Sequence, residues 1–195
     1  MKRICLLLAA AVLLCMPLSA AAAAEVPEKS GELLQSPDGR FQITLPEGFE
    51  DAAGTLDAEG DLDAAYLLET ENSSLPAYAV FHAEQTDGTV LTGFDDYFVV
   101  LTMGISSGSM FSDVELSGAT DYTLKASRMT CRKISFSGVW HQEDGDASRE
   151  VTCRIYAVDA GGGLCGHFFC WSPSEKEKEA EVLFDAIADS LVMLH

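Results

Sequence analysis

The second half of the chain contains the stretch LCGHFFCW, residues 164–171, in which two cysteines and one histidine lie close together. Such a cluster can hold a metal ion, form a redox pair or line the inside of a β-sheet. Side chains alternate between the two faces of a strand, so Cys165 and Cys170 point to opposite faces and cannot share one tetrahedral zinc site. The spacing also differs from a redox C-x-x-C motif. The stretch therefore predicts a buried strand, with His167 packed or partly exposed within it.

The preceding strand determines which cysteines can pair. With a turn at residues 159–163, one register places Cys153 directly opposite Cys170, and the β-carbons of such a pair lie about 4.5–5.5 Å apart. A small twist would bring them into disulfide range. The sequence leaves two alternatives open: one possible disulfide, Cys153–Cys170, or four reduced core cysteines. Cys131 and Cys165 are expected to share a face but to lie too far apart for a bridge.

The chain begins with the features of a secretory signal peptide. A short basic start precedes an apolar run at residues 4–18 and small residues at 19–24 that fit an A-x-A cleavage site. The apolar run is short for a membrane span, which needs about 20 residues. We therefore expect a signal peptide at residues 1–24, cleaved before Glu25, and a flexible N-terminal segment at residues 25–31.

A lipid anchor at Cys15 is the alternative to cleavage before Glu25. Leu14 disfavours it, because a lipoprotein site favours a small residue at that position. In either case the protein is expected to be secreted or to lie at the cell envelope. No later segment is apolar enough to cross a bilayer, so we expect no transmembrane segment in the mature chain.

The charge balance excludes some classes of partner. The chain has 31 acidic and 12 basic residues and a formal net charge of −19. Such a surface repels nucleic acid and anionic lipid, so we expect no nucleic-acid partner. The chain contains no Walker or H-E-x-x-H motif, and its one match to G-x-S-x-G, residues 104–108, falls at the expected exit of a helix, so we expect no enzyme. A hydrolase with an unrecognised site stays an alternative.

One acidic segment resembles the beginning of a calcium loop. Its carboxylates alternate along the chain, at positions Asp57, Glu59, Asp61 and Asp63. However, Leu62 stands where such a loop has glycine, and Leu68 where it has a bidentate glutamate. A solvated acidic loop is therefore favoured. The segment is still the best metal candidate, and Ca²⁺ is the one cofactor considered.

Turn and helix signals divide the first half of the chain. A hairpin is predicted at residues 32–46, with its turn at Ser36-Pro37-Asp38-Gly39. Its second strand alternates Phe41, Ile43 and Leu45 onto one face. Further strands are expected at residues 64–70 and 77–85. A helix is expected from an N-cap at Thr92, with Asp95 at its third position, to about residues 104–108.

The second half predicts a run of strands and a final helix. The strands are expected at residues 113–124, 126–140, 149–157 and 164–171. The helix is expected to start with Ser172 as N-cap, Pro173 at the first position and Glu175 at the third. Its apolar stripe consists of Ala180, Leu183, Phe184, Ile187, Ala188 and Leu191. Its solvent side is expected to carry Lys176, Glu179, Asp185 and Asp189.

This order of elements predicts an α+β fold on an antiparallel sheet, in a single domain spanning residues 32–195. Three stretches resemble the PsbP-like fold: residues 41–49, residues 93–97, and residues 131–138 followed by two strands and a helix ending at 187–191. An extrinsic photosystem II protein, a Ran-binding nuclear import factor and many exported bacterial proteins share this fold.

The resemblance implies an α/β/α sandwich, in which helices flank both faces of one antiparallel sheet. It also implies a non-enzymatic binding or assembly role, and none of the relatives' functional residues has a matching motif here. We therefore expect an exported module at the cell envelope, with an unknown protein or small ligand outside the cytoplasm as its partner. A calcium-responsive accessory protein using residues 57–63 and the hydrolase are the two alternatives.

Overall fold

The described residues form a mixed α+β fold with two antiparallel sheets and two α-helices. The computed structural model describes residues 31–36, 38–46, 49–51, 64–70, 75–86, 91–107, 111–141 and 148–194. The predicted signal peptide, Cys15 and the acidic segment at residues 57–63 lie outside these residues. Within them, no helix combines the length and the apolar character that crossing a bilayer would need.

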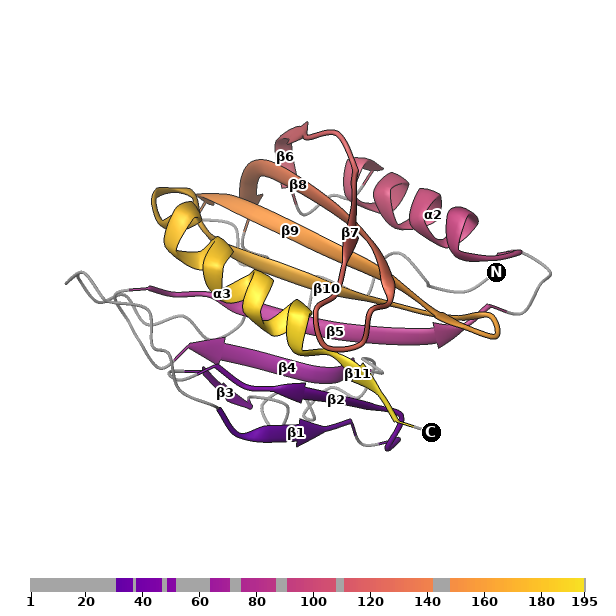
Figure 1. Ribbon diagram of the computed structural model, residues 1–195. Helices are drawn as coiled ribbons and strands as arrows, with labels where there is room; N and C mark the ends of the chain where they lie inside the picture. Colours follow the sequence, from indigo (N-terminus) through magenta and orange to yellow (C-terminus); the bar gives the residue numbers. More distant parts are fainter. Residues whose placement is uncertain are drawn as a thin grey trace.

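The larger sheet is the framework of the fold. Its strand order is β3-β4-β5-β10-β9-β8-β6 (Figure 1). Strand β7 also pairs with β8, on the same edge as β6 but further along the strand. Every pairing between these strands is antiparallel. The bounds are β3 Phe49–Asp51, β4 Ala64–Thr70, β5 Tyr78–Gln85, β6 Phe111–Leu116, β7 Thr120–Thr123, β8 Thr130–His141, β9 Ser148–Gly161 and β10 Leu164–Pro173.

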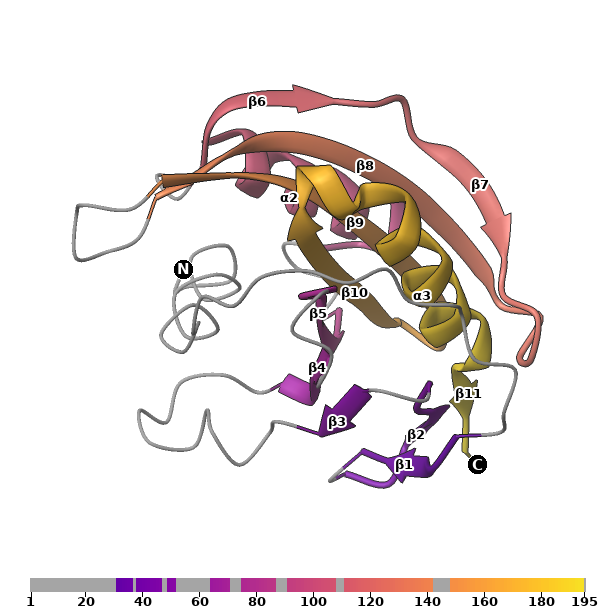
Figure 2. The same ribbon diagram turned by 90° about the vertical axis from the view of Figure 1, so that its left-hand side faces the viewer.

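A smaller sheet contains the predicted hairpin. Its order is β1-β2-β11, with β1 at Leu33–Gln35, β2 at Phe41–Thr44 and β11 at Val192–Met193. The Gly39 N–H donates to the Ser36 carbonyl at 2.8 Å, and the φ of Gly39 is +71°, a conformation that glycine adopts without strain. The hairpin is therefore confirmed. Both views place this sheet beside the C-terminal end of the final helix (Figures 1 and 2).

The two helices contribute to different apolar clusters. Helix α2 (Phe94–Ser107) contributes Phe98, Leu101 and Ile105 to a cluster with Ile155 and Phe169. Helix α3 (Glu177–Ser190) follows the short 3-10 helix η1 (Ser174–Lys176). The predicted apolar stripe of α3 is buried in the other cluster, with Phe41, Ile43, Tyr156 and Phe168. In Figure 1, α3 crosses in front of β9 and β10.

The predicted start of the last helix is wrong. Strand β10 continues through Pro173, whose φ of −54° and ψ of 140° are extended, and α3 begins only at Glu177. No side-chain cap bonds to the first turn of η1 or α3. A proline ring fixes φ near −65°, which suits both the first turn of a helix and an extended strand. The proline signal therefore could not distinguish the two.

The other differences are smaller. The strand predicted at residues 113–124 divides into β6 and β7, with an irregular register beside Asp113, whose φ is +53°. The short strands β3 and β11 were not predicted. At the start of α2, it is Asp96 rather than Asp95 whose carboxylate accepts the Thr92 N–H, at 3.0 Å, and the Thr92 hydroxyl.

Candidate functional site

The predicted calcium ligands Asp57, Glu59, Asp61 and Asp63 lie outside the described residues. Within the part of the chain that the structure describes, no group of three or more His, Cys, Asp or Glu side chains is placed to hold a metal ion. The candidate chemistry in this part therefore depends on the thiols, the histidines and the charged side chains packed against the large sheet.

The stretch at residues 164–171 forms β10, and its predicted alternation is confirmed. Cys170 belongs to the cluster that contains the α3 stripe, together with Phe168. Cys165 instead packs with Tyr97 of α2. The two thiols therefore point to opposite faces of the sheet, as expected, and cannot act on one metal ion or as a redox pair.

The predicted pairing of Cys153 with Cys170 is wrong by one residue. Cys153 lies opposite Trp171, and Cys170 lies opposite Arg154. The turn at residues 161–163 consists of three glycines with positive φ, and a β-bulge beside it shifts the register of the whole hairpin. Because one residue of slip exchanges the faces, the two sulfurs lie in different clusters.

All four described cysteines are buried free thiols, which agrees with the second alternative, four reduced core cysteines. The same slip makes the expected shared face of Cys131 and Cys165 wrong, since Cys131 packs on the side of α3. Burial raises the pKa of Cys131 to about 12 and that of Cys165 to about 11. It raises the pKa of Cys153 and Cys170 well above the usual value. At neutral pH these thiols stay protonated and are poor nucleophiles.

His167 is fully packed rather than partly exposed. It is 2% exposed, and its Nδ1 lies 2.5 Å from the Tyr97 hydroxyl of α2. Its Nε2 has no hydrogen-bond partner among the described residues. The ring of His82, its neighbour on β5, lies 5.8 Å away between centroids. Burial, and secondarily His82, lower the pKa of His167 to about 3, so the imidazole is neutral at physiological pH.

A second polar cluster lies between α3 and the sheet. Arg154 of β9, which is 7% exposed, reaches Glu181 at 2.8 Å and Glu177 at 3.2 Å. Lys133 of β8 reaches Asp185 at 2.6 Å and Glu181 at 3.4 Å. The two cations of the sheet thus face three carboxylates of the helix.

Tyrosine hydroxyls complete this cluster. Tyr156 donates to Asp185 at 2.5 Å, and Tyr122 of β7 donates to Asp189 at 2.7 Å. Lys125 pairs with Asp189 at 2.5 Å. Burial, followed by the neighbouring charges and hydrogen bonds, raises the pKa of both tyrosines, so both stay protonated donors.

The sequence does not predict this cluster, because the helical pattern places Asp185 and Asp189 on the solvent side, and that placement is wrong. Asp189 is 7% exposed, and Asp185 is half-buried. A signal was present in the sequence. Acidic residues recur every four positions along the helix, a spacing that keeps them on one side: Glu177, Glu181, Asp185 and Asp189. A matching set of cations on a strand is needed before such a stripe can be assigned to the buried side.

One serine–histidine pair lies at an edge of the large sheet. The Ser112 hydroxyl of β6 and the His141 Nε2 of β8 are 2.8 Å apart, and Ser112 also contacts the Asp113 carboxylate at 3.3 Å. His141 is exposed. Among the described residues, no carboxylate bonds to the other ring nitrogen of His141 to orient it, as a catalytic triad requires.

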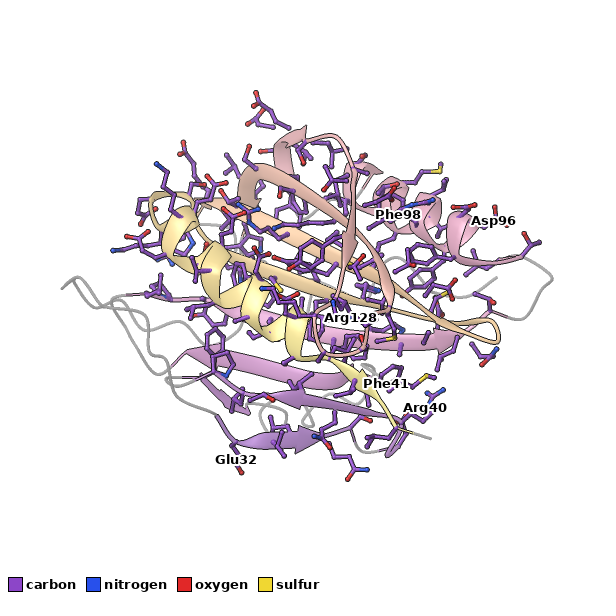
Figure 3. The ribbon with its side chains drawn as sticks, in the orientation of Figure 1. Glu32, Arg40, Phe41, Asp96, Phe98 and Arg128 are labelled. Carbon is purple, nitrogen blue, oxygen red and sulfur yellow. The ribbon has the colours of Figure 1, made fainter. Side chains whose placement is uncertain are left out.

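Polar side chains also lie at the N-terminal end of α2. Arg132 of β8 pairs with Asp95 at 2.6 Å and lies over the rings of Phe94 and Phe98, 5.3 and 5.4 Å from their centroids. Figure 3 labels Phe98 and Asp96 on this helix. The pair is largely exposed on the Asp95 side, so it contributes little to stability by itself.

Comparison with known proteins places this geometry in a fold. No protein-family model matches the chain, and no curated protein sequence matches it. The solved structure of cyanobacterial PsbP (CyanoP) from Synechocystis sp. PCC 6803 is similar, with a TM-score of 0.56 and 14% identity over 89% of this chain and 98% of that chain. The chain has the PsbP-like fold. The Ran-binding protein Mog1p of Saccharomyces cerevisiae is also similar, with a TM-score of 0.50 and 13% identity over 86% of this chain and 96% of that chain.

In this PsbP-like chain, the buried polar side chains bond mainly to one another. The carboxylates of α3 bond to sheet cations and tyrosines, and Tyr97 bonds to His167. The thiols are protonated and the buried histidine is neutral. These groups hold the two helices on the sheet, and the described residues contain no activated nucleophile among them.

Proposed function

We propose that this protein is an exported, non-enzymatic binding or assembly module whose partner is a protein or small ligand outside the cytoplasm. The observation that carries the proposal is the PsbP-like fold, shared over most of both chains with Mog1p, a protein described as Ran-binding. The internal use of the buried polar groups also supports a role without catalysis. Ran itself is not the proposed partner, because an exported protein does not meet it.

The proposed location is the cell envelope or the exterior. It is supported by the signal-peptide pattern at residues 1–24 and by the excess of acidic residues, which suits a soluble protein that avoids anionic surfaces. Cleavage before Glu25 releases the chain, and lipid modification of Cys15 would instead hold it at the membrane. N-terminal sequencing of the exported protein distinguishes the two.

We also propose the three-layer arrangement for this fold, with α2 and α3 on the two faces of the large sheet. It is supported by the alternation along β10, where Phe168 and Cys170 pack with α3 residues and Phe169 packs with α2 residues. In that arrangement both faces of the central strands are covered. The outer surfaces of the helices and the sheet edges are then left for a partner.

The proposal is tested by site-specific crosslinking followed by reconstitution. A photoreactive residue is placed, one at a time, at exposed apolar positions on three elements: Val99 of α2, Leu116 of β6 and Val182 of α3. A binding module should give one crosslinked species from one position and much less from the others. The captured partner, once purified, should bind the unmodified chain saturably in calorimetry. A chain that crosslinks equally from all three positions and binds no purified candidate contradicts the proposal.

The hydrolase is a second candidate, because Ser112 and His141 are within hydrogen-bond distance. In that case Ser112 would be the nucleophile and His141 its base. A panel of ester and phosphate substrates, assayed with the wild type and with Ser112→Ala, tests it. Turnover that the substitution abolishes would favour the hydrolase over the binding module.

The calcium-responsive alternative requires Asp57, Glu59, Asp61 and Asp63 to bind the ion. Calorimetry with millimolar calcium tests it on the full exported chain. Heat of binding that disappears when Asp57 and Asp61 are both replaced by Asn would establish a calcium site there. No heat in the wild type would exclude it.

A further inference from the structure

The contact between α2 and the sheet includes one buried histidine. His167 lies near the middle of β10, with Tyr97 of α2 above it, and the two side chains bond to each other at 2.5 Å. Tyr97 is 3% exposed and His167 is 2% exposed. Water therefore reaches this imidazole only when α2 moves away from the sheet.

The charged form of His167 has no adequate partner while α2 is in place. A protonated imidazole has two N–H donors. The Tyr97 oxygen can accept one of them, but Nε2 has no partner among the described residues. A buried cation with one unpaired donor is strongly unfavourable. The closed arrangement therefore excludes the proton.

Charged and titratable groups surround His167 on the neighbouring strands and on α2. His82 lies directly opposite on β5, and Arg132 lies two strands away in the same row across the sheet. Arg132 adds positive charge to this side. The groups that can carry negative charge lie further away. Glu84, Asp159 and Cys165 lie two positions further along the strands, and Asp95 and Asp96 lie in the first turn of α2. Asp95 is already paired with Arg132, and Asp96 with Thr92.

We propose that the Tyr97–His167 contact is an acid-sensitive latch, which releases α2 from the sheet when His167 takes up a proton. In the open state the imidazole is solvated and has its ordinary proton affinity, with a pKa near 6.5. In the closed state burial lowers that pKa to about 3. The open state thus binds one more proton than the closed state between these two values. The opening equilibrium constant of α2 should therefore rise about tenfold for each unit of pH below about 6.5.

Release of α2 would expose apolar side chains of the sheet that the helix now packs against, among them Ile155 and Phe169. The latch is independent of the proposed binding role, although an exported protein that meets acidic surroundings would present a new apolar surface there. The test of the latch measures the opening of a helix, so a failure of the binding proposal would not affect the latch.

The test is native-state hydrogen exchange of the exported chain between pH 7 and pH 5, with rates corrected for the intrinsic effect of pH. In the wild type, the α2 amides should open more readily than the slowest-exchanging core amides, and their opening equilibrium constant should rise about 25-fold from pH 7 to pH 5. In His167→Gln, which stays neutral, the α2 dependence should disappear. The matched control is His141→Gln, which removes an exposed histidine and should keep the wild-type dependence.

Several outcomes would overturn the latch. They are a wild-type α2 that opens equally at all pH values, a dependence that persists in His167→Gln, and α2 amides whose opening constant equals that of the slowest core amides, which would mean that α2 opens only by global unfolding. If His167→Gln does not fold, Tyr97→Phe is the second variant. It keeps the ring and the histidine but removes the hydrogen bond, so α2 should open more at every pH with the wild-type dependence retained. A loss of that dependence in Tyr97→Phe would also contradict the proposal.

Discussion

At the scale of single residues, burial controls the chemistry of the thiols more than their number does. The four described cysteines lie in the core on two sides of the sheet, and each has a raised pKa. A thiol reacts as its thiolate, which these sites disfavour. The close spacing of Cys165 and Cys170 in the sequence therefore indicates a packed strand and not a reactive centre.

Burial should protect the four thiols from alkylation in the folded protein. In the folded protein at pH 8, iodoacetamide should modify none of Cys131, Cys153, Cys165 and Cys170 within the time that modifies a free peptide thiol. In denaturant without reductant, all four should be modified, because none is oxidised. Mass spectrometry counts the labels. Two modified thiols in denaturant would mean that a disulfide is present after all.

Gly166 illustrates how one atom limits β10. A β-carbon at this position would lie 2.9 Å from the Phe81 ring and 3.1 Å from the His82 carbonyl oxygen of β5. Gly166→Ala should therefore lower the free energy of unfolding by about 1–3 kcal/mol through overpacking. The matched control is Gly118→Ala, where nothing lies within 4 Å, and its effect should stay within about 0.5 kcal/mol. Urea unfolding of both variants measures the difference, and equal stabilities would refute the packing argument.

At the scale of elements, the sequence predicted periodicity better than register. Strand β10 and the faces of its side chains follow from period-two alternation, and the α3 stripe follows from helical spacing. The pairing of Cys153 could not be derived, because it depends on a bulge beside the glycine turn at residues 161–163. A bulge adds one residue to one strand, and hydrophobic pattern alone does not locate it when both faces are apolar.

The candidate site was harder to predict than the fold. The sequence indicated a packed or partly exposed His167, but its partner Tyr97 is 70 positions away and belongs to another element. Lys133 and Arg154 likewise look like ordinary strand residues. Only the three-dimensional pairing with the acidic side of α3 shows why they tolerate burial. Such contacts depend on how the elements dock, which local pattern does not specify.

The docking of α3 should depend on its acidic stripe. Asp185→Ala removes the acceptor of Tyr156 and the closest partner of Lys133, whose side chain is 15% exposed. Leaving these groups without a partner should lower the free energy of unfolding by about 2–3 kcal/mol. The control is Glu179→Ala, on the exposed side of the same helix, which should cost less than about 0.5 kcal/mol. If urea unfolding gives both variants the same stability, the stripe does not hold the helix.

At the scale of the whole molecule, the fold is a sheet whose helices are attached through different chemistry. Helix α3 is held by an apolar stripe together with partly buried ion pairs, whereas α2 is held by apolar side chains, a hydrogen bond to a neutral histidine and one largely exposed ion pair, Asp95–Arg132. The two attachments respond differently to acid. Carboxylates stay ionised down to about pH 4–5, but a solvated imidazole takes up a proton near pH 6.5.

Global stability should therefore fall with acid before the carboxylates titrate. The lowered pKa of His167 means that the folded protein excludes a proton that the unfolded chain binds. Its contribution is fully present above about pH 6.5 and is lost as the pH falls toward 3. Between pH 6.5 and 5 the free energy of unfolding should decrease by about 1.6 kcal/mol from this group. Urea unfolding at several pH values measures the decrease.

The contribution of His167 is separated from that of the other histidines by substitution. His167→Gln should flatten the dependence between pH 6.5 and 5, whereas His141→Gln, which changes an exposed side chain away from the α2 contact, should retain it. A dependence that survives in His167→Gln would assign it to another group. A wild-type stability that does not change over this range would mean that the buried imidazole finds a partner for its proton in the folded protein.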